Sequence, residues 1–263
     1  MHDVYHIPVL LTEVLEHLAI KPDGVYVDCT FGGGGHSKAI LERLGEGGKL
    51  ILFDQDEDAR RNVPDDKRVL FIPHNFRHIS RFLQLHGIKE VDGLLADLGV
   101  SSHQFDVAER GFSTRFNASL DMRMDQRQQK TAFDVVNTYS EAQLHKLFEQ
   151  YGEVTNSKTL ARTLVEARRT APLQTIDAFK AAVQSIVKGN PAKYLAQVFQ
   201  ALRIEVNDEM GALKELLQQL PQVIKPGGRA AVAARRVPNA FPPRRKPWRG
   251  LLNFWRQRLA AKD

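Results

Sequence analysis

The chain has 263 residues, of which 43% are hydrophobic, and a formal net charge of +6. This length suffices for one large domain or two with a full core. No apolar run approaches the roughly 20 residues that span a bilayer, and the first residues lack the pattern of a signal peptide. The single cysteine, Cys29, excludes an internal disulfide and fits a reducing compartment, so we expect a cytoplasmic protein with Cys29 in its core.

The first hundred residues alternate helical patterns with apolar runs that are typical of strands. In chain order the expected elements are a helix over 8–19, a strand over 24–29, a helix over 37–44, a strand over 49–54, a helix over 57–62, a strand over 69–73, a helix over 78–86 and a strand over 91–97. This alternation predicts an α/β fold with a parallel sheet covered on both faces.

A run of glycines follows the first predicted strand, in the sequence Thr30-Phe31-Gly32-Gly33-Gly34-Gly35-His36-Ser37. Glycines let a ligand approach the backbone, and the helix that follows offers free N–H groups. Asp54 ends the second predicted strand, where nucleotide-binding α/β sheets hold a pair of ribose hydroxyls. Together these features predict a cofactor that contains a nucleoside.

The spacing within this loop narrows the class of cofactor. The loop lacks the Gly-Lys-Ser/Thr ending of a phosphate-binding P-loop, and Ser37 replaces the third glycine of a dinucleotide fingerprint that begins at Gly32. Asp28, Asp54 and Asp97 each stand near the end of a predicted strand, and unpaired carboxylates at one site repel one another. A cationic ligand offsets that repulsion. S-adenosylmethionine, which carries an ammonium, a sulfonium, a ribose and an adenine but no phosphate, fits this pattern.

Further candidate contacts lie in the glycine loop and after the third and fourth predicted strands. Phe76 offers an aromatic face for adenine, although a core position explains it almost as well. Gln104 and the serines before it supply polar groups that orient a ligand. His36 is expected to contact the cofactor. The histidines and the one cysteine lack the spacing of a zinc site, so no metal is expected.

A gap of about 130 residues separates Asp97 from the next strand-like run, at 228–233. A parallel crossover needs only about a dozen residues, so the gap predicts an inserted domain. Its pattern is helical, with a capping box at Ser140 and further helices over 156–169, 177–187 and 192–205. Leucines at 213, 216, 217 and 220 predict a crossover helix that packs on the sheet. Residues 107–204 carry 14 Lys/Arg against nine Asp/Glu, which fits a polyanionic partner or merely a solvated helical surface.

Seven motifs in a fixed order give the chain a family resemblance. They cover His6 to Leu11, Asp28 to Ser37, Phe53 to Asp56, Asp97 to Gln104, Glu109 to Ser113, Leu120 to Asp125 and Arg203 to Glu209. Over about residues 5–229 the chain resembles the bacterial RsmH (MraW) family. These are S-adenosylmethionine-dependent methyltransferases that modify the exocyclic N4 of one cytidine in the decoding region of 16S ribosomal RNA.

The resemblance implies a Rossmann-like class I methyltransferase sheet with an inserted all-helical domain that helps to recognise RNA. The implied limits are 1–106 and 205–233 for the methyltransferase domain, 107–204 for the insert and 234–263 for an atypical basic tail. The cofactor contacts of the family map onto Gly34, Gly35, His36, Asp54, Phe76, Asp97 and Gln104. Asp97 is also the best-placed group to orient or deprotonate the amine. The implied partner is small-subunit ribosomal RNA or the assembled small ribosomal subunit.

The chain departs from the family pattern after Arg229. The family continues with a Ser-Phe/Tyr-His-Ser-Leu-Glu-Asp-Arg segment, whereas here ten Lys/Arg, one acid and five prolines follow residue 225. Because proline removes the donors of a strand ladder, we expect the C-terminal strands to be missing or altered. A frameshifted or truncated gene explains this ending, and we favour it over a basic RNA-binding tail.

Two other functions stay open at this point. An RNA-binding ribosome-assembly factor with little or no turnover shares the same fold and fits an altered C-terminus. An NAD-dependent oxidoreductase is disfavoured by Ser37 and Asp28. Four arginines are candidates for phosphate contacts in either RNA-binding function: Arg110, Arg115, Arg123 and Arg127.

Overall fold

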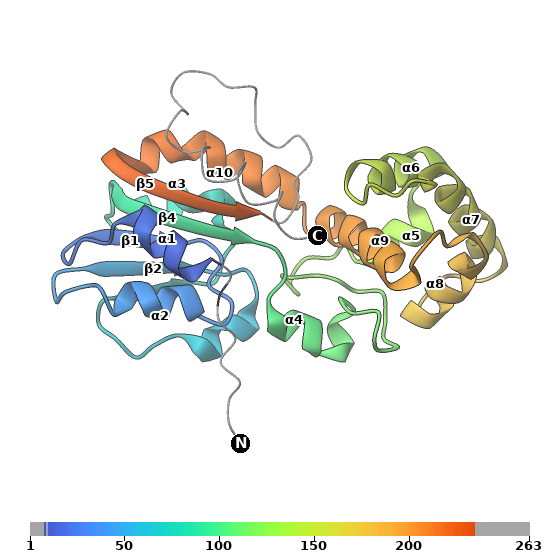
Figure 1. The fold of residues 1–263 in the computed structure, drawn as a ribbon, viewed down its shortest axis with the longest axis horizontal. Coiled ribbons are helices and arrows are strands. Elements are labelled where there is room, and N and C mark those ends of the chain that lie inside the picture. The colour runs from blue at the N-terminus through green and yellow to red at the C-terminus, as the bar shows by residue number, and fades with distance from the viewer. Residues whose placement is uncertain (1–7, 9, 235–263) are drawn as a thin grey trace. The chain divides into compact units, whose positions relative to one another are not determined.

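A computed structural model of the chain describes residue 8 and residues 10–234. These residues belong to two compact units, one built from the chain up to Gly99 and from Leu213 onward, the other from Val100–Ala212 (Figure 1). The predicted boundaries, at 106/107 and 204/205, lie seven and eight residues inside these limits. Apart from Ala234, the predicted basic tail lies outside the described residues, and so does the part of the chain in which the C-terminal strands are expected to be missing or altered.

The first unit contains a five-stranded sheet in the order β3-β2-β1-β4-β5, and every neighbouring pair is parallel. The strands are β1 (Val25–Asp28), β2 (Lys49–Phe53), β3 (Val69–Ile72), β4 (Val91–Leu98) and β5 (Ile224–Ala234). Four of the five residues of β2 are buried, as expected for a strand covered on both faces. The predicted parallel α/β fold is confirmed. The chain order reverses between β1 and β4, which is where open α/β sheets bind ligands.

Helices cover both faces of this sheet (Figure 1). Helices α1 (Leu11–Leu18) and α2 (Gly35–Leu41) pack on one face, while α3 (Ile79–Leu85) and α10 (Glu209–Val223) pack on the other. The predicted crossover helix is confirmed as α10, because Leu216 and Leu220 are buried against the sheet. The predicted helix over 57–62 is a 3-10 helix, Glu57–Asn62. Cys29 lies in the core, as predicted.

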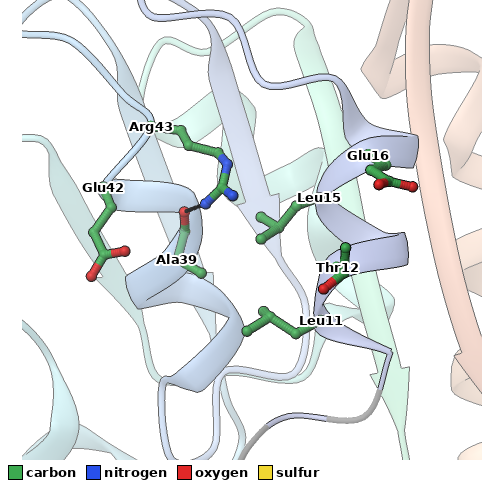
Figure 2. Close-up of a pocket in the computed structure, with 7 residues that line it drawn as sticks. All are labelled: Leu11, Thr12, Leu15, Glu16, Ala39, Glu42 and Arg43. Atoms are coloured by element: carbon green, nitrogen blue, oxygen red, sulfur yellow. Dashed lines mark hydrogen bonds between the residues drawn. The ribbon is translucent and has the colours of Figure 1, made fainter.

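A hollow of about 440 Å³ lies between α1 and α2 (Figure 2). Its lining consists of Leu11, Thr12, Leu15, Glu16, Ala39, Glu42 and Arg43. The guanidinium of Arg43 folds back and donates to the carbonyl oxygen of Ala39 over 2.9 Å. None of the residues predicted to bind a cofactor lines this hollow.

The buried Asp92 of β4 holds the start of β5 in place. Its carboxylate accepts a hydrogen bond from the backbone N–H of Val25 (3.0 Å) and pairs with Lys225 (2.5 Å) and Lys21 (3.4 Å). The register shifts just here, so that the chain between Ile224 and Arg229 loops out opposite Asp92. This irregularity accommodates Pro226 inside a strand.

We expect Asp92→Ala to lower the free energy of unfolding by about 2 kcal/mol, because it leaves the buried N–H of Val25 without its acceptor and removes the partner of Lys225. Urea denaturation measures the change. Lys21→Ala is the matched control. The Lys21 side chain is 65% exposed, so its loss is expected to cost less than about 0.5 kcal/mol. Equal losses in the two variants would show that Asp92 acts only through surface charge.

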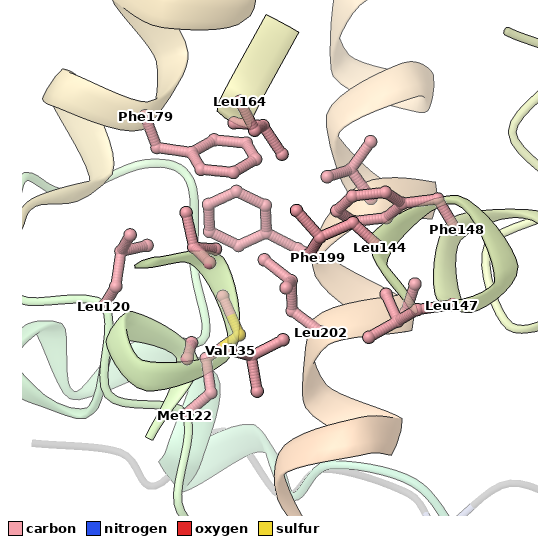
Figure 3. Close-up of a cluster of buried hydrophobic side chains, with 14 of the residues drawn as sticks. Leu120, Met122, Val135, Leu144, Leu147, Phe148, Leu164, Phe179, Phe199 and Leu202 are labelled. Atoms are coloured by element: carbon pink, nitrogen blue, oxygen red, sulfur yellow. The ribbon is translucent and has the colours of Figure 1, made fainter. Parts of the chain in front are cut away.

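The second unit is helical, as predicted. Its helices are α4 (Ser102–Asp106), α5 (Ala132–Thr138), α6 (Glu141–Gln150), α7 (Ser157–Thr170), α8 (Ile176–Val183) and α9 (Pro191–Val206). Their apolar faces enclose a core that includes Leu144, Phe148, Phe179, Phe199 and Leu202 (Figure 3). The capping box predicted at Ser140 starts α6. Helices α4 and α5 were not expected from the sequence.

Hydrogen bonds connect two of the sequence motifs in this unit, Leu120 to Asp125 and Arg203 to Glu209. The side chain of Asn207 accepts from the backbone N–H of Met124 (2.7 Å) and donates to the carbonyl oxygen of Met122 (2.8 Å). Met122 has a φ of 60°, a conformation that needs such external support. Arg110 is buried and donates to the carbonyl oxygens of Arg123 and Met124, so it is not exposed for a phosphate contact.

Candidate cofactor site

Three carboxylates gather at the carboxyl ends of adjacent strands. Asp28 ends β1 and pairs in register with Leu52 of β2 and Leu95 of β4. Asp54 and Asp97 each stand two residues further along those neighbouring strands. Burial is the main cause of the raised pKa values of Asp54 and Asp97, and the nearby charge of Asp28 adds to both rises. The geometry therefore brings together the carboxylates that the sequence singled out.

Asp28 is sealed inside the fold rather than presented to a ligand, since only 1% of it is exposed. The Ser37 hydroxyl donates to Oδ2 over 2.6 Å, and the Thr30 backbone N–H donates to Oδ1 over 3.0 Å. Burial raises the pKa of Asp28, while these hydrogen bonds oppose that rise. Because Thr30 and Ser37 stand at the two ends of the glycine loop, Asp28 anchors both ends of the loop to β1.

Asp54 holds the loop from the opposite side. Its Oδ2 accepts from the backbone N–H of Gly32 (2.7 Å), and its Oδ1 accepts from the backbone N–H of Asp56 (2.8 Å). Burial raises the pKa of Asp54 to about 6, against the lowering effect of these two bonds. Each carboxylate oxygen has a second lone pair. Asp54 is therefore able to fix the loop and to accept a hydroxyl donor at the same time.

Asp97 is half-buried and is positioned through its backbone, whose N–H donates to the Thr30 hydroxyl oxygen over 2.7 Å. Burial raises the pKa of Asp97; the charge of His36 opposes this rise and that of Asp28 adds to it. His36 lies in the first turn of α2, which starts at Gly35, two residues before the predicted start. It is buried, and its charge also opposes the rise that burial causes in the pKa of Asp28.

The glycines of the loop serve different purposes. Gly34 has a φ of 78°, and a Cβ on it would lie only 2.9 Å from the ring of Phe31, so the backbone and the packing both require glycine. A Cβ on Gly33 would meet nothing within 4 Å, so that side of the loop is open to a ligand. Gly35 allows the start of α2 to approach Pro8. The Asn62 amide closes the loop by donating to the carbonyl oxygen of Gly32 over 2.9 Å.

Phe76 and Gln104, the two remaining predicted contacts, have local structural roles. Phe76 is half-buried and packs against the core on the α3 and α10 face of the sheet. Gln104 belongs to the helical unit, where it is buried in α4. Its Oε1 accepts from the backbone N–H of Ser101 (3.1 Å), and the Ser101 hydroxyl accepts from the backbone N–H of Gln104 (3.2 Å). Gln104 is thus the N3 residue of a capping box.

Sequence reasoning missed the parts played by Thr30, Phe31 and Ser37. Thr30 connects the ends of β1 and β4, Ser37 anchors the loop, and Phe31 packs under Gly34 and edge-on against Phe71. Only the hydrogen bond from the backbone N–H of Thr30 to the carboxylate of Asp28 has a local signal in the sequence. The carboxylate of an Asp commonly accepts from the backbone N–H two residues later in the chain.

Across residue 8 and residues 10–234, no group of three or more His, Cys, Asp or Glu side chains is placed to hold a metal ion. Within the same residues, no helix has both the length and the apolar character that a membrane crossing needs.

The model of the MraW methylase family matches residues 3–235. The chain belongs to this family. Two relatives are both called ribosomal RNA small subunit methyltransferase H. The one from Flavobacterium johnsoniae is 58% identical over 229 residues, which are 87% of this chain and 76% of the relative. The one from Bacteroides fragilis strain YCH46 is 55% identical over 229 residues, or 87% and 75%.

Similarity to solved structures is weaker than similarity to these MraW methylase relatives. An Aeropyrum pernix fibrillarin in complex with S-adenosyl-L-methionine matches with a TM-score of 0.27 and 13% identity, over 56% of this chain and 57% of that chain. A protein-L-isoaspartate O-methyltransferase matches with a TM-score of 0.30 and 16% identity, over 49% and 43%.

Proposed function

We propose that this chain is an S-adenosylmethionine-dependent methyltransferase that modifies the exocyclic N4 of a cytidine in the decoding region of 16S ribosomal RNA. The observation that carries the proposal is the carboxylate cluster beside an open glycine loop at the switch point of a parallel sheet. Membership of the MraW methylase family and the names of the relatives support a small-subunit ribosomal RNA substrate. The N4 position and the decoding region rest on the motif resemblance.

The described residues fit this cofactor. Asp54 would accept hydrogen bonds from the ribose hydroxyls with the lone pairs that its bonds to the loop leave available, and the open side of Gly33 would admit the ligand to the backbone. The negative charge of Asp54 and Asp97 suits the ammonium and the sulfonium. Gly34, Gly35 and His36 belong to the same loop. Phe76 and Gln104 stay predicted contacts that rest on the resemblance.

The bound cofactor supplies an electrophilic methyl group on its sulfonium. The chain contributes mainly position, because aligned reactants react far faster than free ones. The exocyclic amine is inaccessible within a helix, so the cytidine is held unpaired or flipped out. Asp97 orients the amine by accepting a hydrogen bond from it, and its raised pKa suits it to take the proton that the product sheds. A ribosomal RNA substrate supports a cytoplasmic location for the protein.

Methyl transfer from labelled S-adenosylmethionine to small ribosomal subunits tests the proposal. Subunits from a strain that lacks the modification are expected to accept label, whereas fully modified subunits are not. Free 16S ribosomal RNA, assayed in parallel, distinguishes naked RNA from the assembled particle as the substrate. Digestion to nucleosides is expected to place the label in N4-methylcytidine. Cofactor and subunit binding without transfer would instead support the ribosome-assembly alternative, and binding of NAD alone would support the oxidoreductase.

A further inference from the structure

The helical unit exposes two aromatic rings that its own core leaves uncovered. Among the described residues, the large apolar side chains that are exposed are Leu85 (73%), Phe105 (42%) and Phe116 (39%). Leu85 stands alone on the sheet unit. Phe105 is the penultimate residue of α4 and Phe116 lies between α4 and α5, so both belong to the helical unit. Arg115 donates to the backbone carbonyl of Phe105 and lies over the ring of Phe116.

Arg115 is exposed yet fixed in place. Its Nε donates to the Ser113 hydroxyl (3.1 Å), and its Nη2 donates to the carbonyl oxygen of Phe105 (3.3 Å) and to Asp106 (2.8 Å). The guanidinium carbon lies 5.3 Å from the centre of the Phe116 ring. The side chain nevertheless remains 59% exposed. Arg115 thus ties the backbone at Phe105 to the ring of Phe116. We call the three exposed side chains of Phe105, Arg115 and Phe116 the stacking surface.

The composition of this surface indicates what it binds. Asp106 neutralises Arg115, so the surface has little net charge with which to attract phosphate. Exposed polar residues, including Ser102, His103 and Asn117, lie close to the two phenylalanines in the sequence. The exposed apolar surface is therefore confined to two single rings, whereas a stable protein interface buries roughly 800 Å² per partner. Unpaired RNA bases, in contrast, stack on single aromatic rings and on guanidinium planes.

We propose that Phe105, Arg115 and Phe116 form a surface on which unpaired bases of the RNA substrate stack. The proposal rests on the proposed function, which requires an RNA whose target base is out of the helix. It assigns to the helical unit a defined contact with bases. The other candidates, the half-buried Arg123 and the exposed Arg127, are each held by a carboxylate two residues earlier.

Fluorescence anisotropy with a labelled, mixed-sequence single-stranded RNA of about twelve nucleotides tests this surface. Phe105→Ala and Phe116→Ala are each expected to weaken binding about tenfold, and Phe116→Trp is expected to retain it. Leu85→Ala, which removes an even more exposed apolar side chain, is the matched control and is expected to bind as the wild type. The same RNA as a blunt duplex is expected to show no difference between the variants.

Salt dependence separates stacking from charge attraction. Between about 0.1 and 0.5 M salt the affinity of every variant falls, but the tenfold ratio between wild type and Phe116→Ala is expected to persist, because stacking releases no counterions. Calorimetry with S-adenosylmethionine is expected to give equal cofactor affinities for all variants.

The possible outcomes separate this inference from the proposed function. Wild-type affinity for single-stranded RNA in both alanine variants would overturn the stacking surface even if methyl transfer is observed. Unchanged RNA affinity with lost binding to assembled subunits would also overturn it and would indicate a ribosomal protein as the partner. Failure of the wild-type chain to transfer methyl groups, with cofactor bound, contradicts the proposed function instead.

Discussion

Asp54→Ala is expected to weaken binding of S-adenosylmethionine about a hundredfold. The ionised carboxylate stands at the end of β2, where it accepts two backbone N–H groups and has lone pairs left for two ribose hydroxyls. A hydrogen bond to a charged group contributes about 1.5–3 kcal/mol, so the loss of two costs at least about 3 kcal/mol, or a hundredfold in Kd. Isothermal titration calorimetry measures this change directly.

The loss of the loop anchor needs a control, because Asp54 also holds the backbone of Gly32. Asn62→Ala provides it. Asn62 is exposed and donates to the carbonyl oxygen of Gly32 from outside the carboxylate cluster. If the effect of Asp54→Ala comes mainly from lost ribose contacts, Asn62→Ala is expected to weaken cofactor binding by less than about fivefold, since it removes one neutral hydrogen bond. Equal losses in the two variants would mean that Asp54 only orders the loop.

The pH dependence of binding gives a second test of the same carboxylate. Burial raises its pKa to about 6, and the ribose hydroxyls need the ionised form as their acceptor. Cofactor affinity is therefore expected to be constant above pH 7 and to fall below pH 6, by up to about tenfold per pH unit. Asp54→Asn is expected to flatten this profile, because the amide does not titrate.

The contribution of Asp54 to the stability of the cofactor-free protein is expected to depend on pH in the opposite direction, so that it increases as pH falls. The folded pKa of Asp54 lies above its unfolded value of about 3.9. The folded state thus binds the proton more tightly, and the contribution of Asp54 to stability is fully present below pH 4 and is lost as pH rises towards 6. Protonation of Asp54 in acid is therefore expected to stabilise the folded protein and, at the same time, to weaken its binding of the cofactor.

The sheet and the positions of its acidic residues could be predicted because they depend on local patterns. Short apolar runs followed by Asp28, Asp54 and Asp97 are sufficient to place three carboxylates at one edge of a parallel sheet. What each carboxylate contacts could not be predicted. Ser37 lies nine residues from Asp28, and Thr30 lies 67 residues from Asp97. Contacts over such separations depend on the assembled fold, so the sequence did not show that Asp28 is sealed from the ligand.

The helical unit shows how one pattern supports two interpretations. The sequence Ser140-Glu141-Ala142-Gln143 was predicted to cap a helix, and it does so. The run from Ser101 to Gln104 has the same spacing and also forms a capping box, but it follows a strand and was interpreted only as polar groups for a ligand. No local sequence pattern predicts the hydrogen bonds that hold Met122, because its partner Asn207 lies 85 residues away.

Asp97→Asn is expected to lower the rate of methyl transfer at least a hundredfold. It also removes one of the two negative charges that face the cations of the cofactor, so cofactor affinity is expected to fall as well, but by no more than about tenfold. The amide keeps the size of the side chain and one acceptor oxygen, but it loses the charge and the basicity that orient the amine and take its proton. General base groups contribute typically 10²–10⁴-fold to a rate. Single-turnover transfer to unmodified small subunits, with calorimetry for the cofactor, separates the two quantities.

Thr30 supplies the matched test of position. Its hydroxyl oxygen accepts the backbone N–H of Asp97 over 2.7 Å, so Thr30→Val removes that acceptor at almost constant volume, and Thr30→Ser restores it. Valine is expected to slow transfer about tenfold, since misplacement of an orienting group by a fraction of an ångström lowers the population of reactive geometries. Serine is expected to recover the rate. If Asp97→Asn weakens cofactor binding but leaves the transfer rate unchanged, Asp97 acts in binding alone. The amine would then lose its proton directly to water.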